Sequence, residues 1–331
     1  MEPEIRARYT DAILHDALHR YGIAPDQIRL LDGFESYIYE YSRNGADFIL
    51  RIGHSRRRTA GLIQGEVEWI NYLAAGGAGV ARAVLSEAGK LVEAIDDGRG
   101  GQFLATAFVK APGCPAWEFG WTPALYEAYG RLIGRIHALS KQYTPSDPAI
   151  RRPDWDDPKN LDTLSWLPED EPVFIEKAQQ ILAHLHTLPR DANSYGLIHQ
   201  DAHSANFFVA EGNQITLFDF DDCVYGWYIY DIAMVVFYMV TNHPGPSDLM
   251  QSFWPCFWQG YCAENTLDRG WLSEIPWFLK LREIDLYAAL LRSFGSTEQI
   301  NDPWPARYMR DRKRRIAEDV PVVEFDFLAP A

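Results

Sequence analysis

The sequence predicts an α+β chain with two lobes, a small antiparallel β lobe followed by a larger, mostly helical lobe. Up to Val109, short stretches of alternating apolar and polar residues are separated by turn signals, which is typical of strands. After Gly113, apolar residues recur at the helical spacing. The chain has 331 residues, about the length of two domains. We therefore expect one domain over residues 1–109 and a second over residues 110–331.

The first lobe is expected to begin with a helix over residues 10–21, which ends at Gly22. Alternating side chains predict strands at residues 37–41 and 48–52. The dipeptide Asn44-Gly45 lies between them and favours a tight hairpin turn. Apolar residues at helical spacing then predict a helix over residues 60–75. Further strands are predicted at residues 83–87, 91–95 and 102–109.

The second lobe is expected to be built mainly from helices. Thr122-Pro123 is typical of a helix start, because proline has no N–H group to satisfy at the first helical position. The apolar face of this helix continues to Leu139. Residues 144–170 are rich in Pro, Asp and Trp and are expected to form a long loop. Further helices are predicted at residues 171–188, 228–241, 246–263, 272–293 and 303–318.

The net charge of the chain restricts the classes of partner that it is expected to bind. The formal net charge is −15, and a protein this acidic repels nucleic acid and anionic membrane surfaces. We therefore expect neither as a partner. The same charge is compatible with a cationic substrate, although it can equally serve solubility alone. Hydrophobic residues make up 47% of the chain, which argues against disorder.

The cysteines and the N-terminus point to a cytoplasmic protein. The cysteines form no Cys-x-x-Cys unit, and their scatter indicates neither a zinc site nor a disulfide framework. The N-terminus is acidic and has no apolar signal segment. The longest strongly apolar run, residues 232–240, is too short to cross a bilayer.

The most informative segment begins at His199. Asp201 and Asn206 have the Asp-x-x-x-x-Asn spacing of a kinase catalytic loop. Asp219 follows the apolar run 215–218, where the metal-binding Asp of a kinase lies. These residue types at these spacings predict phosphoryl transfer from ATP to a hydroxyl group.

Each of the three residues has an expected role. Asp201 is the candidate catalytic base, because a carboxylate can hold the acceptor hydroxyl and accept its proton. Asn206 and Asp219 are the candidate Mg²⁺ ligands, because Mg²⁺ prefers hard oxygen donors and takes few of them from protein. An aspartate that caps a turn and an asparagine that begins a strand are the structural alternatives.

Other residues around the motif are expected to support it. His199 and His203 are expected to shape the loop rather than to transfer protons. Asp231 begins an apolar helix, so its charge needs partners, and we expect it to bind the backbone of the catalytic loop.

The first lobe offers a candidate phosphate-binding pair. Glu66 falls on the apolar face of the 60–75 helix, where a carboxylate needs a cation nearby, and Arg51 in the preceding strand is the expected partner. Arg51 would then hold phosphate as the strand lysine of kinases does. An ordinary salt bridge is the structural alternative. Ser36, in the loop 31–36, is a further candidate phosphate contact.

These residues together resemble the superfamily of aminoglycoside phosphotransferases, choline kinases and type II homoserine kinases. The family loop reads His-Gly-Asp-x-His-x-x-Asn, and this chain has His199-Gln200-Asp201-Ala202-His203-Ser204-Ala205-Asn206. Asp219-Phe220 matches the family's metal-binding turn, and Leu50-Arg51 matches its nucleotide-binding strand. His137 resembles a histidine that precedes the family's linker. Segment 225–228 resembles the homoserine-kinase and stress-kinase branch more than antibiotic-modifying enzymes.

The resemblance implies a two-lobed, protein-kinase-like fold that binds ATP and Mg²⁺. Residues 1–109 would form the nucleotide-binding lobe, and residues 110–331 would carry the catalytic loop and the acceptor site. Phe108 and Val109 would lie in the hinge and contact the adenine. The chain departs from the family at Gln200, which replaces the usual glycine. Either the backbone there has a negative φ, or Gln200 accepts strain.

Several functions remain open on the sequence alone. The leading hypothesis is a kinase that acts on a small, possibly cationic hydroxyl compound, with Asp221, Asp222 and the aromatic-rich helices after Pro244 as candidate acceptor contacts. A serine/threonine protein kinase of the stress-response type keeps the fold and changes the acceptor. A catalytically silent nucleotide-binding protein is a third reading. A metallohydrolase is a fourth, because His199-x-Asp201-x-His203 is a compact set of metal-capable residues. ATP and GTP are not distinguished.

Overall fold

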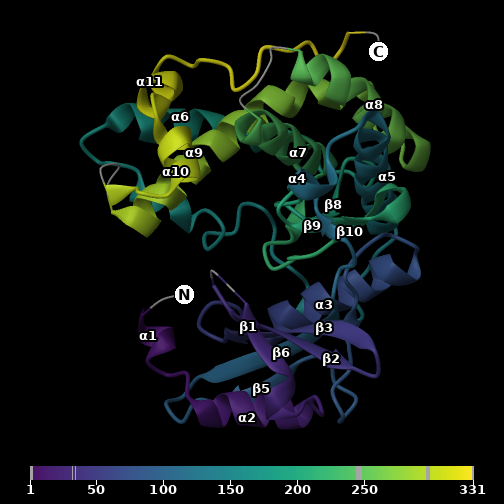
Figure 1. Ribbon diagram of the computed structural model, residues 1–331. Helices are drawn as coiled ribbons and strands as arrows, with labels where there is room; N and C mark the ends of the chain where they lie inside the picture. Colours follow the sequence, from purple (N-terminus) through teal and green to yellow (C-terminus); the bar gives the residue numbers. More distant parts are fainter. Residues whose placement is uncertain (1–2, 32, 34, 244–247, 296–298, 330–331) are drawn as a thin grey trace. The chain divides into compact units, whose positions relative to one another are not determined.

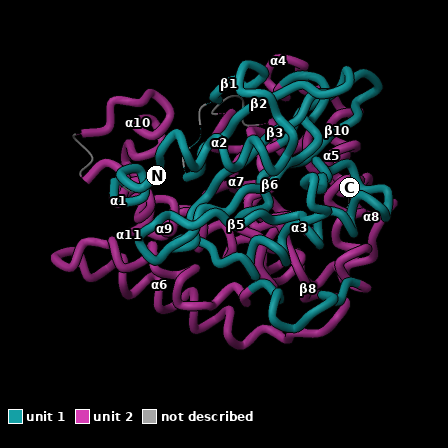
Figure 2. The backbone as a smooth tube through the Cα atoms, turned by 90° about the horizontal axis from the view of Figure 1, so that it is seen from below, with its two compact units in different colours: residues 1–114, 143–152, 207–221 teal, residues 115–142, 153–206, 222–331 magenta. Residues whose placement is uncertain are grey.

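The computed structural model describes residues 3–31, 33, 35–243, 248–295 and 299–329. The chain divides into two compact units, which Figure 2 shows in different colours and which are described here one at a time. The first comprises residues 1–114, 143–152 and 207–221, and the second comprises residues 115–142, 153–206 and 222–331. The predicted domains 1–109 and 110–331 stay a prediction.

An antiparallel sheet forms the framework of the first unit. Its strands follow the order β1-β2-β3-β6-β4, and β5 also pairs with β6. The predicted strands in β2, β3 and β6 are confirmed, whereas β1 was not predicted. The two strands predicted at residues 83–87 and 91–95 are shorter, and both pair with β6. The bounds are β1 (Ile28–Leu31), β2 (Tyr37–Arg43), β3 (Ala46–His54), β4 (Ala83–Val84), β5 (Glu93–Asp96) and β6 (Gln102–Val109).

The hairpin between β2 and β3 turns where the sequence predicts it. Arg43 pairs with Ala46, so Asn44 and Gly45 form a two-residue loop. Both have positive φ, 54° for Asn44 and 77° for Gly45. Asparagine and glycine tolerate this left-handed conformation better than other residues, which is why they favour such turns.

Helices cover both faces of this sheet (Figure 1). Helix α2 (Asp11–Arg20) packs on one face against β6 residues Phe103, Ala105 and Ala107. Helix α3 (Ala60–Ala75) packs on the other, where Leu104 joins Ile63 and Val67. Successive side chains of a strand point to opposite faces, so β6 contributes to both layers. Both helices agree with the sequence prediction.

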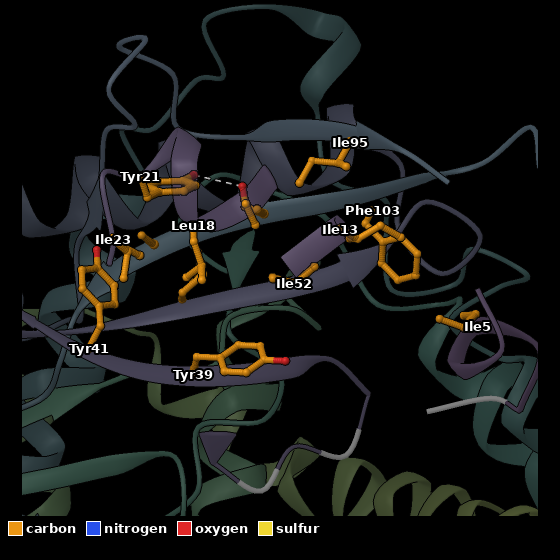
Figure 3. Packing of buried hydrophobic residues seen from close by; sticks show 14 residues of the cluster. Ile5, Ile13, Leu18, Tyr21, Ile23, Tyr39, Tyr41, Ile52, Ile95 and Phe103 are labelled. Atoms are coloured by element: carbon orange, nitrogen blue, oxygen red, sulfur yellow. Dashed lines mark hydrogen bonds between the residues drawn. The ribbon is translucent and has the colours of Figure 1, made fainter. Parts of the chain in front are cut away.

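The layer beneath α2 also contains a polar anchor. Figure 3 shows Tyr21 at the end of α2 among the buried residues, and its hydroxyl donates to the carbonyl of Ala105 at 3.0 Å. The phenol is almost fully buried, so this bond satisfies a group that would otherwise be costly to bury. A short helix, α1 (Pro3–Arg6), precedes α2.

A later hairpin joins the first unit and carries Asp219. Strands β9 (Phe207–Ala210) and β10 (Gln214–Leu217) pair antiparallel. Leu217 is tied to the segment after α3, because its N–H donates to Gly79 at 2.9 Å and its carbonyl accepts from Ala81 at 2.8 Å. Asp219 therefore belongs to the same unit as Arg51, although residues 115–142 and 153–206 of the second unit lie between them in the sequence.

The second unit is mostly helical, as predicted. Helix α5 (Pro123–Ser140) packs closely on α8 (Leu249–Glu264) through glycines. A Cβ on Gly130 would lie 1.9 Å from the Phe257 carbonyl oxygen, and one on Gly260 would lie 2.1 Å from that of Glu127. Only glycine permits this approach.

The remaining helices of the second unit refine the predictions. The helix predicted at 272–293 begins as a 3₁₀ turn and continues as α9, and the one predicted at 303–318 is two helices, α10 and α11. Residues 246–247 of the helix predicted at 246–263 lie outside the described residues, as does Pro244. The bounds are α4 (Ala116–Phe119), α6 (Pro172–Leu185), α7 (Tyr228–Asn242), α9 (Ile275–Phe294), α10 (Pro303–Met309) and α11 (Arg312–Ala317).

A small two-stranded ladder supports the catalytic loop. Strands β8 (Tyr195–Ile198) and β11 (Val224–Trp227) pair antiparallel in the second unit, and neither was predicted as a strand. The predicted loop 144–170 contains short 3₁₀ turns at Pro148–Ile150 and Asp162–Trp166. A short strand, β7 (Cys114–Pro115), lies where the two units adjoin in sequence. In the described part of the chain, no helix combines the length and apolarity of a membrane span.

Candidate active site

The loop 199–206 follows β8 in the second unit, and Asp231 holds its first residues. Asp231 lies in the first turn of α7 and is fully buried. Its Oδ2 accepts the N–H of His199 at 2.9 Å, and its Oδ1 accepts the N–H of Gln200 at 2.6 Å. The predicted role of Asp231 as a backbone anchor is confirmed.

A buried chain of hydrogen bonds extends this anchor into the helices. Because a carboxylate only accepts, His137 Nε2 donates to Asp231 Oδ2 at 3.2 Å, and His137 Nδ1 accepts from the Tyr261 hydroxyl at 3.0 Å. Burial lowers the pKa of His137, which outweighs the opposing effect of Asp231. His137 on α5 is thus a neutral link between α8 and the loop.

The loop backbone is strained at Gln200. Its φ is 71°, the left-handed region that glycine adopts easily and other residues avoid. Of the two possibilities left open by the sequence, Gln200 therefore takes the strained one. The Asp231 bond to its N–H and a hydrogen bond from its side chain to Tyr230 accompany this conformation.

The two histidines of the loop accept hydrogen bonds from its own backbone. His199 Nδ1 accepts the N–H of Asp201 at 3.2 Å, and His203 Nδ1 accepts the N–H of Ala205 at 3.1 Å. These bonds confirm the predicted loop-shaping roles. They also use one ring nitrogen of each histidine within the loop, which weakens the metallohydrolase reading.

The predicted base and one predicted metal ligand lie together. The Asn206 side-chain amide donates through Nδ2 to the carbonyl oxygen of Asp201 at 3.0 Å and to its Oδ2 at 3.3 Å. This orientation leaves the amide oxygen of Asn206 uncommitted to Asp201. An oxygen donor so placed is what a hard cation requires.

Sequence reasoning missed Arg282. This residue of α9 donates from Nη2 to Asp201 Oδ1 at 3.0 Å. Burial opposes ionisation of Asp201, but its interactions with His203 and Arg282 hold the pKa of Asp201 well below its usual range. A signal was present, because Arg282 and Asp285 are charged residues in a largely apolar helix and so require partners.

In the first unit, the predicted pair of Arg51 and Glu66 is confirmed. Arg51 Nη1 lies 2.8 Å from Glu66 Oε1, and Nη2 lies 2.7 Å from Oε2. Glu66 is fully buried. Burial alone would lower the pKa of Arg51, but Glu66 and further carboxylates raise it above its ordinary value, so the guanidinium stays charged.

Asp219 lies within the electrostatic reach of this pair. It is exposed just after β10, and its charge contributes to the raised pKa of Arg51. Its φ is 64°, a strained conformation of the kind that is often found at functional sites. Within the units, the structure thus brings Asn206 to Asp201 and Asp219 to Arg51.

Asp221 does not fit its expected place in a cationic acceptor site. Its Oδ2 lies 2.5 Å from Arg57 Nη1 and 3.4 Å from Arg58 Nε. Burial opposes its ionisation, but these arginines lower the pKa of Asp221 to about 2. Arg57 also pairs with Glu35. The charge of Asp221 is therefore neutralised inside the first unit and is not available to an amine.

The other predicted nucleotide contacts lie on β6 or against β3 in the first unit. Ser36 packs on β3, since a Cβ on Gly53 would lie 3.2 Å from its hydroxyl oxygen. The Arg51 guanidinium lies 5.1 Å from the centre of the Phe108 ring. The N–H of Val109 already donates to Arg82 at 2.9 Å, so only the carbonyl of Val109 remains for an adenine. Asp32 and Phe34 of the predicted loop lie outside the described residues.

The aromatic residues of α8 are core residues. The side chains of Phe253, Trp254, Phe257, Trp258 and Tyr261 are all buried. Phe253 and Phe257 pack edge-on against Tyr126 and Tyr129 of α5. Their number reflects packing between helices, and the expectation that they line an acceptor site is not supported.

Comparisons with known proteins agree on the family. The model of the phosphotransferase enzyme family matches residues 26–271. An amicoumacin kinase of Bacillus subtilis (strain 168) is 36% identical over 330 residues, which cover 97% of this chain and 96% of that protein. The branch that segment 225–228 suggested stays a prediction.

Solved structures show the same fold. The amicoumacin kinase hAmiN in complex with AMP-PNP, Ca²⁺ and Ami has a TM-score of 0.92 at 37% identity and covers 99% of both chains. A microcompartment-associated aminopropanol kinase has a TM-score of 0.74 at 24% identity over 94% of this chain and 98% of its own, which shows the fold alone. The predicted α+β, protein-kinase-like fold and the predicted resemblance are confirmed. The chain therefore belongs to the phosphotransferase enzyme family and is a small-molecule kinase that acts on a hydroxyl group.

Proposed function

We propose that this chain is an ATP- and Mg²⁺-dependent kinase that phosphorylates a hydroxyl group of an amicoumacin-like compound. The observation that carries the acceptor is the likeness to an amicoumacin kinase over nearly the whole length of both proteins. A similar structure that holds AMP-PNP, Ca²⁺ and Ami supports a nucleotide and a divalent cation as cofactors.

The residues present fit a magnesium ion. Mg²⁺ takes one or two hard oxygen ligands from protein, and phosphate and water supply the others. The Asn206 amide oxygen, which does not bind Asp201, and the exposed Asp219 carboxylate are the proposed ligands. Bound there, the ion would offset the negative charge of the transferred phosphate.

The protein groups would orient the reactants. Asp201 accepts a hydrogen bond from the hydroxyl group of the acceptor and thereby aims the hydroxyl oxygen at the γ-phosphorus. A bond forms between that oxygen and phosphorus, the bond from phosphorus to the bridging β-phosphate oxygen breaks, and its electron pair leaves with ADP. The hydroxyl proton passes to Asp201 and then to solvent. Arg51 holds the phosphates, with Ser36 beside it, and the Phe108 ring and the Val109 carbonyl contact the adenine.

The proposal is tested first by nucleotide binding and then by turnover. Calorimetry with ATP and GTP, with and without Mg²⁺, is expected to show binding that requires Mg²⁺ and is lost in Asp219→Ala. Coupled detection of ADP then compares amicoumacin, kanamycin, choline and homoserine, with Asp201→Asn as the inactive control. We expect turnover with amicoumacin and a product heavier by one phosphoryl group.

Each other outcome identifies a specific error. Turnover of kanamycin, choline or homoserine without turnover of amicoumacin would keep the kinase and replace the acceptor. Nucleotide binding without turnover of any small hydroxyl compound, together with labelling of a protein substrate, would favour a protein kinase. Binding with neither activity would identify a catalytically silent protein, and no binding at all would refute the proposed site.

A further inference from the structure

Both carboxylate oxygens of Asp201 are held in the second unit, but by different kinds of partner. Oδ1 accepts from Arg282 on α9 at 3.0 Å. Oδ2 faces the loop itself, with His203 Nε2 and the Asn206 amide nitrogen each at 3.3 Å. The loop contacts are longer and local, whereas the arginine reaches Asp201 from a helix 81 residues further along the chain.

Arg282 has a fixed position because other groups hold it. Its Nη1 donates to Asp285 Oδ2 at 2.9 Å, one turn along α9. Its Nη2 also donates to the Tyr238 hydroxyl on α7, and the guanidinium lies 5.4 Å from the centre of the Tyr238 ring. The side chain is only 17% exposed. A planar guanidinium with several donors, held on several sides, fixes the direction of the group it binds.

We propose that Arg282 is a positioning residue, which retains Oδ1 of Asp201 and thereby presents Oδ2 to the acceptor hydroxyl. The inference rests on the proposed function of Asp201. An acceptor hydroxyl can replace the longer contacts at Oδ2, while the bond from Arg282 keeps the carboxylate from rotating. Correct orientation matters because in-line transfer depends on near-attack geometry, and a misplacement of about 1 Å can cost about 100-fold in rate.

The competing explanation is a salt bridge that only fastens α9 to the loop. Such a bridge would affect stability without a specific effect on turnover. The chain offers a matched control in Arg312, which pairs with Glu283, the residue next to Arg282 on α9. Arg312 is 10% exposed, so it is similar in burial and in bond type, yet it does not contact Asp201.

The experiment compares Arg282→Ala, Arg282→Lys and Arg312→Ala with the wild type in steady-state kinetics, using the acceptor that the turnover assay identifies. We expect Arg282→Ala to lower kcat by about 100-fold with the KM for ATP unchanged. Arg282→Lys, which keeps the charge but not the fork, should fall between that variant and wild type. Arg312→Ala should lose stability and keep its kcat.

Added guanidinium distinguishes positioning from a purely structural role. It should restore part of the kcat of Arg282→Ala in a saturable way, whereas equal concentrations of sodium chloride should not, and it should not raise the kcat of Arg312→Ala.

Equal kcat values for the two alanine variants would overturn the inference. So would a large loss in Arg282→Ala that neither guanidinium nor the lysine variant relieves. If Arg282→Ala does not fold, the lysine variant decides, and a kcat equal to wild type refutes the proposal. A wild type that phosphorylates nothing refutes the proposed function itself.

Discussion

Arg51 and Glu66 form a bidentate ion pair inside the first unit, with both nitrogen-oxygen distances at or below 2.8 Å. The pair joins the central strand β3 to helix α3 and is almost fully buried. A buried pair of this kind contributes little over a hydrophobic replacement, but the loss of one partner leaves an uncompensated charge.

Glu66→Gln is therefore expected to lower the free energy of unfolding by about 3–5 kcal/mol. Urea denaturation measures this loss. Glu68→Gln is the matched control on the same helix, where the carboxylate is half-buried and binds Tyr143 and Ser146, and it should cost less. Replacing both partners, as in Arg51→Met with Glu66→Leu, should recover stability while nucleotide binding is lost. Equal losses of unfolding free energy in Glu66→Gln and Glu68→Gln would contradict this account.

Gln200 is expected to tolerate glycine and to reject a β-branched residue. Glycine relieves the left-handed backbone but costs about 0.5–1 kcal/mol in chain entropy, so Gln200→Gly should be close to neutral in stability. Gln200→Val should lose about 1–3 kcal/mol. Gln214→Val is the control, because Gln214 has a φ of −73° and begins strand β10. Thermal or urea unfolding of the variants checks the order, and a stable Gln200→Val would show that the loop backbone can relax.

The pH dependence of stability should report His137. The pKa of His137 in the folded protein lies below the ordinary value of 6.5. As the pH falls below 6.5, His137 is therefore protonated in the unfolded chain before it is protonated in the folded chain. The free energy of unfolding should consequently fall as the pH drops from about 7 toward about 5. His137→Gln should flatten this slope, whereas His15→Gln, at an exposed position, should leave it unchanged. A slope that is the same in both variants would assign the effect to other groups.

Asp231→Asn is expected to loosen the catalytic loop. In Asp231, each carboxylate oxygen accepts one backbone N–H group, from His199 or from Gln200. The asparagine amide keeps only one of these acceptors and points its own N–H groups at the second backbone N–H. That buried N–H then lacks an acceptor, which costs about 1–3 kcal/mol. We expect a lower free energy of unfolding and a lower kcat, with Mg²⁺-dependent nucleotide binding weakened less than turnover. Unfolding and turnover assays test this, and a variant with unchanged kcat would show that the loop holds its shape without Asp231.

Much of the fold could be predicted because its signals are local. The turn at Asn44-Gly45, helix α3 and the anchoring role of Asp231 each depend on a few neighbouring residues. The short strands β8 and β11 were missed for the opposite reason, since each has little periodicity of its own and forms only when its partner pairs with it. The helix predicted over 303–318 is interrupted at Asp311, whose φ of 62° breaks the helical path.

By itself, the sequence determined the family, the spacing of Asp201, Asn206 and Asp219, and the need of Glu66 for a cation, because motif spacing and helical periodicity are properties of short segments. Only the tertiary structure decided which partners these groups have. Arg282 binds Asp201, and arginines neutralise the charge of Asp221. The N–H of Val109 donates to the carbonyl of Arg82 within the first unit. The physical reason is that buried charges and backbone groups are satisfied by whatever side chain packing brings within reach, and packing joins residues that no local pattern connects.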